Sequence, residues 1–237
     1  MPTPLYSIVL PIFNEAENLP GLFREIITVM ERLGRFEVIC VDDGSQDQSR
    51  TVITEMSATD PRFRLLALSA NRGQSTALWA GCSVATGTFI ITLDADLQND
   101  PADLANMVPY LESYDMVSGW RKDRQDPWLK RISSSIANAI RNRLTHEDIK
   151  DTGCSLKIMR TSILRQVRPF DGMHRFLPTL MKMAGAKVKE TPVRHRPRIA
   201  GRSNYGVINR AVSSFLDLLA VRWMQKRQLH YTIEIQK

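Results

Sequence analysis

Short apolar runs alternate with stretches of helical periodicity along the first 94 residues of the chain. The runs typical of buried strands lie at 7–13, 37–41, 64–68 and 88–94. Between them, apolar side chains recur at three- and four-residue spacing, which predicts helices at about 19–33, 47–58 and 73–85. Strands joined by single helices imply right-handed crossovers and a mainly parallel sheet. The pattern therefore predicts an α/β fold in which helices flank the sheet.

The second half of the chain is less regular but continues the alternation. Helices are predicted at 101–111, 128–144, 160–168 and 174–184, and strands at 115–121, 155–159 and 188–195. A final helix is predicted at 207–225, with an apolar stripe of Val207, Ile208, Ala211, Val212, Phe215, Leu218, Leu219 and Trp223. Arg210, Asp217 and Arg222 interrupt this helix, so it lacks the ~20 consecutive apolar residues needed to span a bilayer.

Polar side chains follow three of the predicted strands at their carboxyl ends. They are Asn14 and Glu15, Asp42 and Asp43, and Asp94 and Asp96. The carboxyl ends of parallel strands meet at one edge of an open sheet, and ligands bind at that edge. Three acidic turns there indicate a ligand site rather than a means of solubility.

The most specific chemistry is expected at Asp94-Ala95-Asp96, which is followed closely by Gln98. If the strand continues through both aspartates, their side chains point to the same face, and a bend brings Gln98 beside them. Three oxygen ligands of this kind suit Mg²⁺ or Mn²⁺, which takes its other ligands from water and substrate phosphates. An isolated pair of aspartates more often marks a strand exit, so the rest of the chain must decide.

Charge is distributed unequally along the chain, whose net charge is +7. Residues 1–118 contain 7 Lys and Arg against 16 Asp and Glu, a net charge of −9, whereas residues 119–237 contain 25 against 9, a net charge of +16. An acidic half with metal ligands and a basic half fit a protein that handles metal-bound phosphates near an anionic surface. No GxGxxG follows the first strand and no GxxxxGK[ST] occurs, so metal and basic side chains must meet the phosphate charge.

The compartment is indicated by cysteine usage and by the two ends of the chain. Cys40, Cys82 and Cys154 are far apart and lack CxxC spacing, which indicates free thiols in a reducing compartment. The first residues have neither a basic region nor a long apolar run, so no signal peptide is expected. Trp223 and the basic residues after it would let the final helix lie flat at an anionic membrane interface, and docking on the protein core or on a partner is the alternative.

Taken together and in order, the motifs resemble those of a known family. The segments that carry the likeness are residues 10–15 with Asn18 and Leu19, residues 41–45, 71–73, 94–98 and 151–154, and Pro197, Arg198, Gly201, Ser203 and Tyr205. Across about residues 5–206 the chain resembles the inverting family 2 glycosyltransferases of GT-A fold, and among them the dolichol-phosphate-mannose-synthase group. The resemblance implies a GT-A domain at 1–206, with a nucleotide-sugar and metal half at 1–118 and an acceptor half at 119–206, and an amphipathic, membrane-associating segment at 207–237.

The resemblance also implies roles for individual positions. Residues expected to contact the nucleotide-sugar donor are Pro11, Phe13, Glu15, Asp43, Ala95, Arg198 and Arg202, and those expected to hold the metal are Asp94, Asp96 and Gln98. Arg121, Arg131 and Ser135 match positions that hold the phosphate of a polyprenyl monophosphate acceptor in this group. The implied enzyme is peripheral, at the inner, cytoplasmic face of the membrane, bound to lipid or to a membrane protein.

Two departures from the group's pattern bear on these roles. Asn204 stands where members often have lysine, which removes a cation from the phosphate loop, although Arg202 is near enough in sequence to compensate. Transmembrane helices that many bacterial relatives carry after this point are not expected here.

Two other functions fit parts of the chain. A saccharide or protein hydroxyl acceptor would need a general base, for which Asp151 is the candidate. A nucleic-acid-binding protein would use the basic residues 119–237 but would leave the acidic half unexplained, so no nucleic-acid partner is expected.

Overall fold

The computed structural model describes residues 3–122, 139, 141–145, 148–197 and 207–228, with the side chains of residues 207–212 left out. The first half contains β1 (Tyr6–Ile12), α1 (Leu19–Leu33), β2 (Phe36–Asp42), α2 (Ser49–Thr59), β3 (Phe63–Ala67), α3 (Gln74–Val84) and β4 (Phe89–Thr92). It is followed by η1 (Pro101–Asp103), α4 (Leu104–Met107), η2 (Val108–Glu112), β5 (Met116–Arg121), β6 (Lys157–Arg160), α6 (Thr161–Leu164), η3 (Met173–Arg175), α7 (Leu177–Met183), β7 (Val188–Val193) and α8 (Val207–Arg227).

The strands form one seven-stranded sheet in the order β3-β2-β1-β4-β6-β5-β7. Strand β6 runs antiparallel to both of its neighbours, β4 and β5, and the other pairs are parallel. Six strands therefore run in one direction, which confirms the predicted mainly parallel sheet. Strand β5 crosses the boundary predicted between residues 118 and 119, and the boundaries themselves stay predictions.

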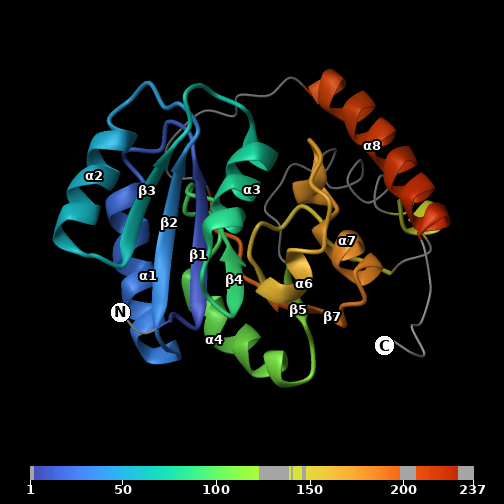
Figure 1. The fold of residues 1–237 in the computed structure, drawn as a ribbon, viewed down its shortest axis with the longest axis horizontal. Coiled ribbons are helices and arrows are strands. Elements are labelled where there is room, and N and C mark those ends of the chain that lie inside the picture. Colours follow the sequence, from blue (N-terminus) through green and yellow to red (C-terminus); the bar gives the residue numbers. More distant parts are fainter. Residues whose placement is uncertain (1–2, 123–138, 140, 146–147, 198–206, 229–237) are drawn as a thin grey trace, which may run out of the picture.

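Two apolar layers cover the two faces of the sheet (Figure 1). Alternate residues of a strand point to opposite faces, so Ile8 and Leu10 of β1 pack with α1, whereas Val9 packs with α3. The first layer includes α1, α2 and α4, and the second includes α3, α6, α7 and α8. The carboxyl ends of β1 and β4 line a pocket at one edge of the sheet.

Several predicted helices are shorter in the structure or are interrupted. The single helix expected at 101–111 is divided into η1, α4 and η2, because Pro109 has no N–H to donate to the preceding turn. The helix expected at 160–168 covers only α6, and the one expected at 174–184 begins as the 3-10 turn η3 before α7. Of the helix predicted at 128–144, residues 141–145 are helical, and most of the remainder lies outside the described residues.

Helix α8 confirms the predicted final helix but corrects its apolar stripe. Leu218 and Val221 are buried in the second apolar layer. Phe215 and Trp223, which were predicted to share a face with Leu218, are 50% and 63% exposed. One face of α8 thus packs on the protein, and another presents apolar side chains to the outside. No helix in the described part of the chain is long and apolar enough to cross a membrane.

Candidate active site

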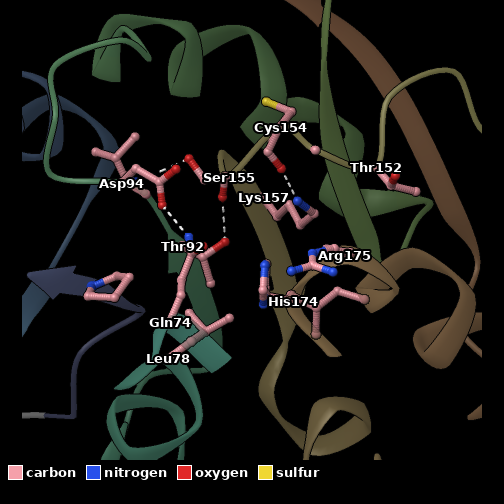
Figure 2. A pocket seen from close by; sticks show the side chains of 14 residues that line it. Gln74, Leu78, Thr92, Asp94, Thr152, Cys154, Ser155, Lys157, His174 and Arg175 are labelled. Atoms are coloured by element: carbon pink, nitrogen blue, oxygen red, sulfur yellow. Dashed lines mark hydrogen bonds between the residues drawn. The ribbon is translucent and has the colours of Figure 1, made fainter. Parts of the chain in front are cut away.

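A pocket of about 100 Å³ lies at the carboxyl ends of β1 and β4. Its wall is completed by the first turns of α3, the turn at 152–155, the first residue of β6 and the junction of η3 with α7. The two sides differ in charge. Figure 2 shows Asp94 on one side and the nitrogen atoms of Lys157, His174 and Arg175 on the other.

The acidic side is formed by the turn after β4. Strand β4 ends at Thr92, so the expectation that strand alternation aligns Asp94 with Asp96 is wrong. A turn after the strand brings Asp94 and Asp96 close together instead. It includes Leu97, whose φ of 60° lies in the left-handed region. Asp96 Oδ1 closes it by accepting a hydrogen bond from the Gln98 N–H at 3.1 Å.

The chemistry of this turn fits a divalent cation. Gln74 Nε2 donates to Asp94 Oδ1 at 2.8 Å, and the Asp94 N–H donates to Ser155 Oγ at 3.1 Å, so the carboxylate is held in place. Burial, together with the nearby charge of Asp96, raises the pKa of Asp94 to about 6. Two carboxylates held close together in a poorly hydrated position attract positive charge, to which Lys157 and Arg121 contribute at Asp94 and a metal ion would add. The assignment of Asp94, Asp96 and Gln98 as its ligands stays a prediction.

Replacing Asp94 with asparagine should stabilise the metal-free protein at neutral pH. Because its pKa is raised from 3.8 to about 6, ionised Asp94 lowers stability progressively as pH rises through that interval. We expect Asp94→Asn to raise the free energy of unfolding by about 2 kcal/mol at pH 7.5, with no difference at pH 3.5. Urea unfolding in EDTA at both pH values measures this. A variant that is less stable at pH 7.5 would show that the carboxylate is satisfied without metal.

The residues predicted to contact the nucleotide lie at or just after the ends of β1 and β2. Pro11 lines the pocket. Phe13 and Glu15, which follow Pro11 closely in the sequence, are partly exposed. Both oxygens of buried Asp43 accept backbone N–H groups, from Arg72 at 2.7 Å and Gly73 at 2.9 Å. Asp43 therefore anchors the turn before α3, whatever contact it makes with a nucleotide.

Another predicted donor contact, Ala95, is buried, and the chain that leads toward residue 198 is attached to the turn after β4. Ala95 is only 3% exposed and packs in the apolar layer of α1, so its backbone is the part left to meet a ligand. The Gln98 carbonyl accepts the Arg196 N–H at 2.8 Å, and Asn99 pairs with His195. The chain after β7 is thus attached to the metal turn just before it reaches residue 198.

Arg121 and Asp151 form a paired unit behind the turn at 152–155. Arg121 donates to Asp151 from Nε at 2.7 Å and from Nη2 at 2.9 Å, with the backbone N–H of Arg121 adding a third bond at 3.2 Å. Asp151 also accepts the Gly153 N–H at 3.0 Å. A Cβ at Gly153 would lie 2.8 Å from Arg121 Nη2, so glycine lets the guanidinium pack against this turn. The carboxylate is held as an anchor for Arg121.

Sequence reasoning missed the basic side of the pocket, formed by Lys157, His174 and Arg175. His174 Nδ1 lies 2.7 Å from Ser75 Oγ at the start of α3. Arg175 Nη1 donates to Ser214 of α8 and lies 3.7 Å from Asp217 Oδ2. The available signal was a lysine inside an apolar strand, because lysine is almost never fully buried without a partner. The predicted residues Arg131, Ser135, Arg198, Arg202 and Asn204 lie outside the described residues.

Comparison with known proteins defines the class to which this fold and site belong. The family model for glycosyl transferase family 2 matches residues 7–168. The chain therefore belongs to that family and is a glycosyltransferase. It is 39% identical over 227 residues to a dodecaprenyl-phosphate galacturonate synthase from Rhizobium johnstonii (strain DSM 114642 / LMG 32736 / 3841), an alignment covering 93% of this chain and 67% of the relative.

Solved structures share the fold at lower identity. A mannosyltransferase from Pyrobaculum calidifontis, in complex with GDP-Man and Mn²⁺, superposes with a TM-score of 0.63 at 18% identity, over 98% of this chain and 66% of that one. Glucosyl-3-phosphoglycerate synthase from Mycobacterium tuberculosis, with Mn²⁺, UDP and glucosyl-3-phosphoglycerate, superposes at 0.68 with 16% identity, over 96% and 81%. These likenesses establish the GT-A fold. The chain spans about two thirds of the length of the curated relative and of the mannosyltransferase.

Proposed function

We propose that the protein transfers a sugar, with inversion, from a nucleotide-sugar donor to a polyprenyl monophosphate. Family membership and the dodecaprenyl-phosphate synthase relative support this proposal. The observation that carries it is the state of Asp151, whose carboxylate accepts four hydrogen bonds from Arg121 and Gly153. With its oxygens occupied by these donors, the carboxylate is not placed to take a proton from an acceptor hydroxyl. The site therefore favours an acceptor that needs no base.

A phosphate acceptor meets that condition because its oxygen is already anionic at neutral pH. The oxygen attacks the anomeric carbon, the bond from that carbon to the donor diphosphate breaks, and the nucleoside diphosphate leaves with the electron pair. No proton has to be moved. Arg121, with Arg131 and Ser135, would hold the acceptor phosphate in line with the sugar.

On the donor side, Pro11, Phe13, Glu15 and Asp43 would hold the nucleotide, and Arg198 and Arg202 would approach its phosphates. A Mg²⁺ or Mn²⁺ ion held by Asp94, Asp96 and Gln98 would neutralise charge on the departing diphosphate. Gln74 would keep Asp94 oriented toward it, through the 2.8 Å bond between their side chains.

The exposed face of α8 suits a peripheral position at the inner face of a membrane. Phe215, Leu216, Leu219 and Trp223 are between 45% and 63% exposed on this helix, and Lys226 and Arg227 follow them. Apolar side chains beside basic ones bind an interface that contains anionic lipid. A membrane-protein partner covering the same face is the alternative.

Removing the aromatic side chain of Trp223 should weaken membrane binding. We expect Trp223→Ala to lower the partition coefficient for anionic vesicles about tenfold, because a large apolar side chain is lost from the interface. Cosedimentation at low and high salt measures this. Tyr110→Ala, which removes a 39% exposed aromatic side chain on η2, is the matched control and should leave binding unchanged. Equal losses for both variants would count against α8 as the membrane contact.

The proposed reaction is tested with donors and acceptors in combination. A thermal-shift panel of nucleoside diphosphates and nucleotide sugars, with and without Mn²⁺, identifies the base and the metal requirement, because stabilisation follows occupancy. GDP-mannose, UDP-glucose, UDP-galacturonate and UDP-N-acetyl sugars are the donors to include. Radiolabelled donor is then offered to polyprenyl phosphate and to saccharide acceptors. Transfer to saccharides alone would refute the lipid acceptor and restore Asp151 as the candidate base.

A further inference from the structure

Ser155 lies where the turn at 152–155 meets the end of β4. It lines the pocket, and its side chain points toward Asp94 (Figure 2). Its carbonyl accepts a hydrogen bond from Thr92 Oγ1 at 2.6 Å, so the backbone of Ser155 is attached to the last residue of β4. No sequence motif indicated a role for this serine. Its place between the two turns makes it a candidate for holding the predicted metal site in shape.

Three hydrogen bonds occupy the Ser155 hydroxyl. Its oxygen accepts the Asp94 N–H at 3.1 Å and the Asn99 Nδ2–H at 2.8 Å. Its proton is donated to the Asp94 carboxylate. Burial and the charge of Asp96 raise the pKa of that carboxylate, and the hydrogen bond from Ser155 lowers it. A serine hydroxyl has one proton to donate and two lone pairs with which to accept, so these three bonds use its capacity in full.

Asn99, which donates to Ser155, is itself fixed. It is 5% exposed, and its Oδ1 lies 3.6 Å from Cys154 Sγ. Its backbone forms an antiparallel bridge with His195, in the segment that follows β7. Because Asn99 occupies one lone pair of the Ser155 oxygen and the Asp94 N–H occupies the other, the remaining direction is that of the hydroxyl proton. That proton is directed at the Asp94 carboxylate.

We propose that Ser155 is a positioning residue for the metal site, which holds the Asp94 carboxylate in the orientation that binds the divalent cation. This inference rests on the proposed function, in which Asp94 is a metal ligand. Gln74 Nε2 donates to Asp94 Oδ1 at 2.8 Å, so donors from α3 and from the turn at 152–155 hold the same carboxylate. Hydrogen bonds to a metal ligand fix its orientation, and removing one lowers metal affinity roughly 10- to 100-fold.

The same bonds argue against a direct contact between Ser155 and a substrate. A hydroxyl that donates its proton and accepts two N–H groups would have to give up one of these bonds to meet a sugar or a phosphate. The turn at 152–155 also supports the acceptor side, because the Gly153 N–H donates at 3.0 Å to Asp151, the anchor of Arg121. One short turn thus joins the two predicted sites, and a substitution at Ser155 should affect the metal rather than the acceptor.

The test measures Mn²⁺ binding without turnover, by electron paramagnetic resonance in the presence of UDP or GDP. We expect Ser155→Ala to raise the Kd for Mn²⁺ about 10-fold. The Mn²⁺ concentration that gives half-maximal transfer should rise by the same factor, while KM for polyprenyl phosphate stays within about twofold of the wild type. Ser155→Thr keeps the hydroxyl and should restore the affinity. Ser155→Cys keeps the size of the side chain but is a weak donor, so it should weaken Mn²⁺ binding even if the alanine variant does not fold.

Ser7 provides a matched control for stability. Its hydroxyl donates to Glu37 Oε1 at 2.6 Å and accepts the Gly87 N–H at 2.8 Å, at the amino end of β1, and it does not line the pocket. Ser7→Ala and Ser155→Ala should each lower the melting temperature by about 3 °C, because each loses hydrogen bonds of the same kind. Only Ser155→Ala should weaken Mn²⁺ binding, which separates a loss of stability from a loss of metal.

The outcomes separate this inference from the function on which it rests. Unchanged Mn²⁺ affinity in Ser155→Ala and Ser155→Cys overturns the inference and leaves the glycosyltransferase proposal in place. A higher KM for polyprenyl phosphate at unchanged Mn²⁺ affinity assigns Ser155 to the acceptor and also overturns it. A wild-type protein that binds no Mn²⁺ with either nucleoside diphosphate removes the metal site, and the inference with it. Weakened Mn²⁺ binding in the variants, together with no transfer from any donor to polyprenyl phosphate, supports the positioning role and refutes the proposed function alone.

Discussion

Asp96→Ala should abolish sugar transfer while leaving the fold intact. The variant removes one of the two carboxylates of the turn after β4, and with it a ligand for the cation that offsets diphosphate charge. A loss of about 4 kcal/mol of transition-state stabilisation corresponds to a decrease in kcat on the order of 10³-fold. Steady-state kinetics across a Mn²⁺ titration measures it. The fold should persist because the hydrogen bond that the Gln98 N–H loses costs only about 1 kcal/mol.

Two matched variants separate metal binding from turn structure. Asp96→Asn keeps the Oδ1 acceptor for the Gln98 N–H but loses the charge, so it should be as inactive as the alanine variant. Asp115→Asn changes an aspartate at the opposite edge of the sheet, where it pairs with Arg160 at 2.9 Å, and should retain wild-type kcat. An Asp96→Ala enzyme that turns over without metal would remove this residue from the metal site.

Breaking the Arg121–Asp151 pair should impair folding and acceptor binding together. The two side chains are 15% and 6% exposed, so removing either one takes a close, hydrogen-bonded counter-charge from a largely buried ion. We expect Asp151→Ala to lower the free energy of unfolding by about 3 kcal/mol. It should also raise KM for polyprenyl phosphate, because Arg121 loses the group that positions it. Urea unfolding and acceptor-dependence kinetics measure the two effects.

A double-mutant cycle distinguishes an anchor from a base. If Asp151 acts through Arg121, the Arg121→Ala/Asp151→Ala double variant should lose less stability and less kcat/KM than the two single losses combined. If Asp151 is a general base, Asp151→Asn should instead lower kcat alone and change its pH profile, with saccharide acceptors the active ones. Asp115→Ala, which breaks a more exposed pair, should cost about 1 kcal/mol or less.

Predictions from local sequence succeeded where periodicity encodes burial. The spacing of Leu19, Leu22 and Ile26 repeats every three to four residues, so α1 and its buried face could be predicted without tertiary information. The same reasoning placed β1, β2 and β3 and the acidic turns at their carboxyl ends. It failed at the end of β4, where an apolar Leu93 made the strand appear to continue two residues beyond Thr92.

Long-range pairing explains what local patterns missed. Strand β6 has four residues and inserts antiparallel between β4 and β5, a position that no local period encodes. That insertion opposes Lys157 to Thr92 and buries its charge in the middle of the sheet. Helix α8 was similarly ambiguous, because apolar residues lie on several of its sides. Packing against the second apolar layer decided that Leu218 turns inward and Trp223 outward.

The sequence by itself determined the fold class, the family and the acidic turn of the candidate site, since these depend on local periodicity and on short motifs in a characteristic order. The tertiary structure alone decided how the charges pair. It joined Asp151 to Arg121 across 30 positions and placed the Lys157 ammonium group against the Cys154 carbonyl. The reason is physical: the environment of a buried charge is set by which strands become neighbours, and here a reversed strand between β4 and β5 makes that choice.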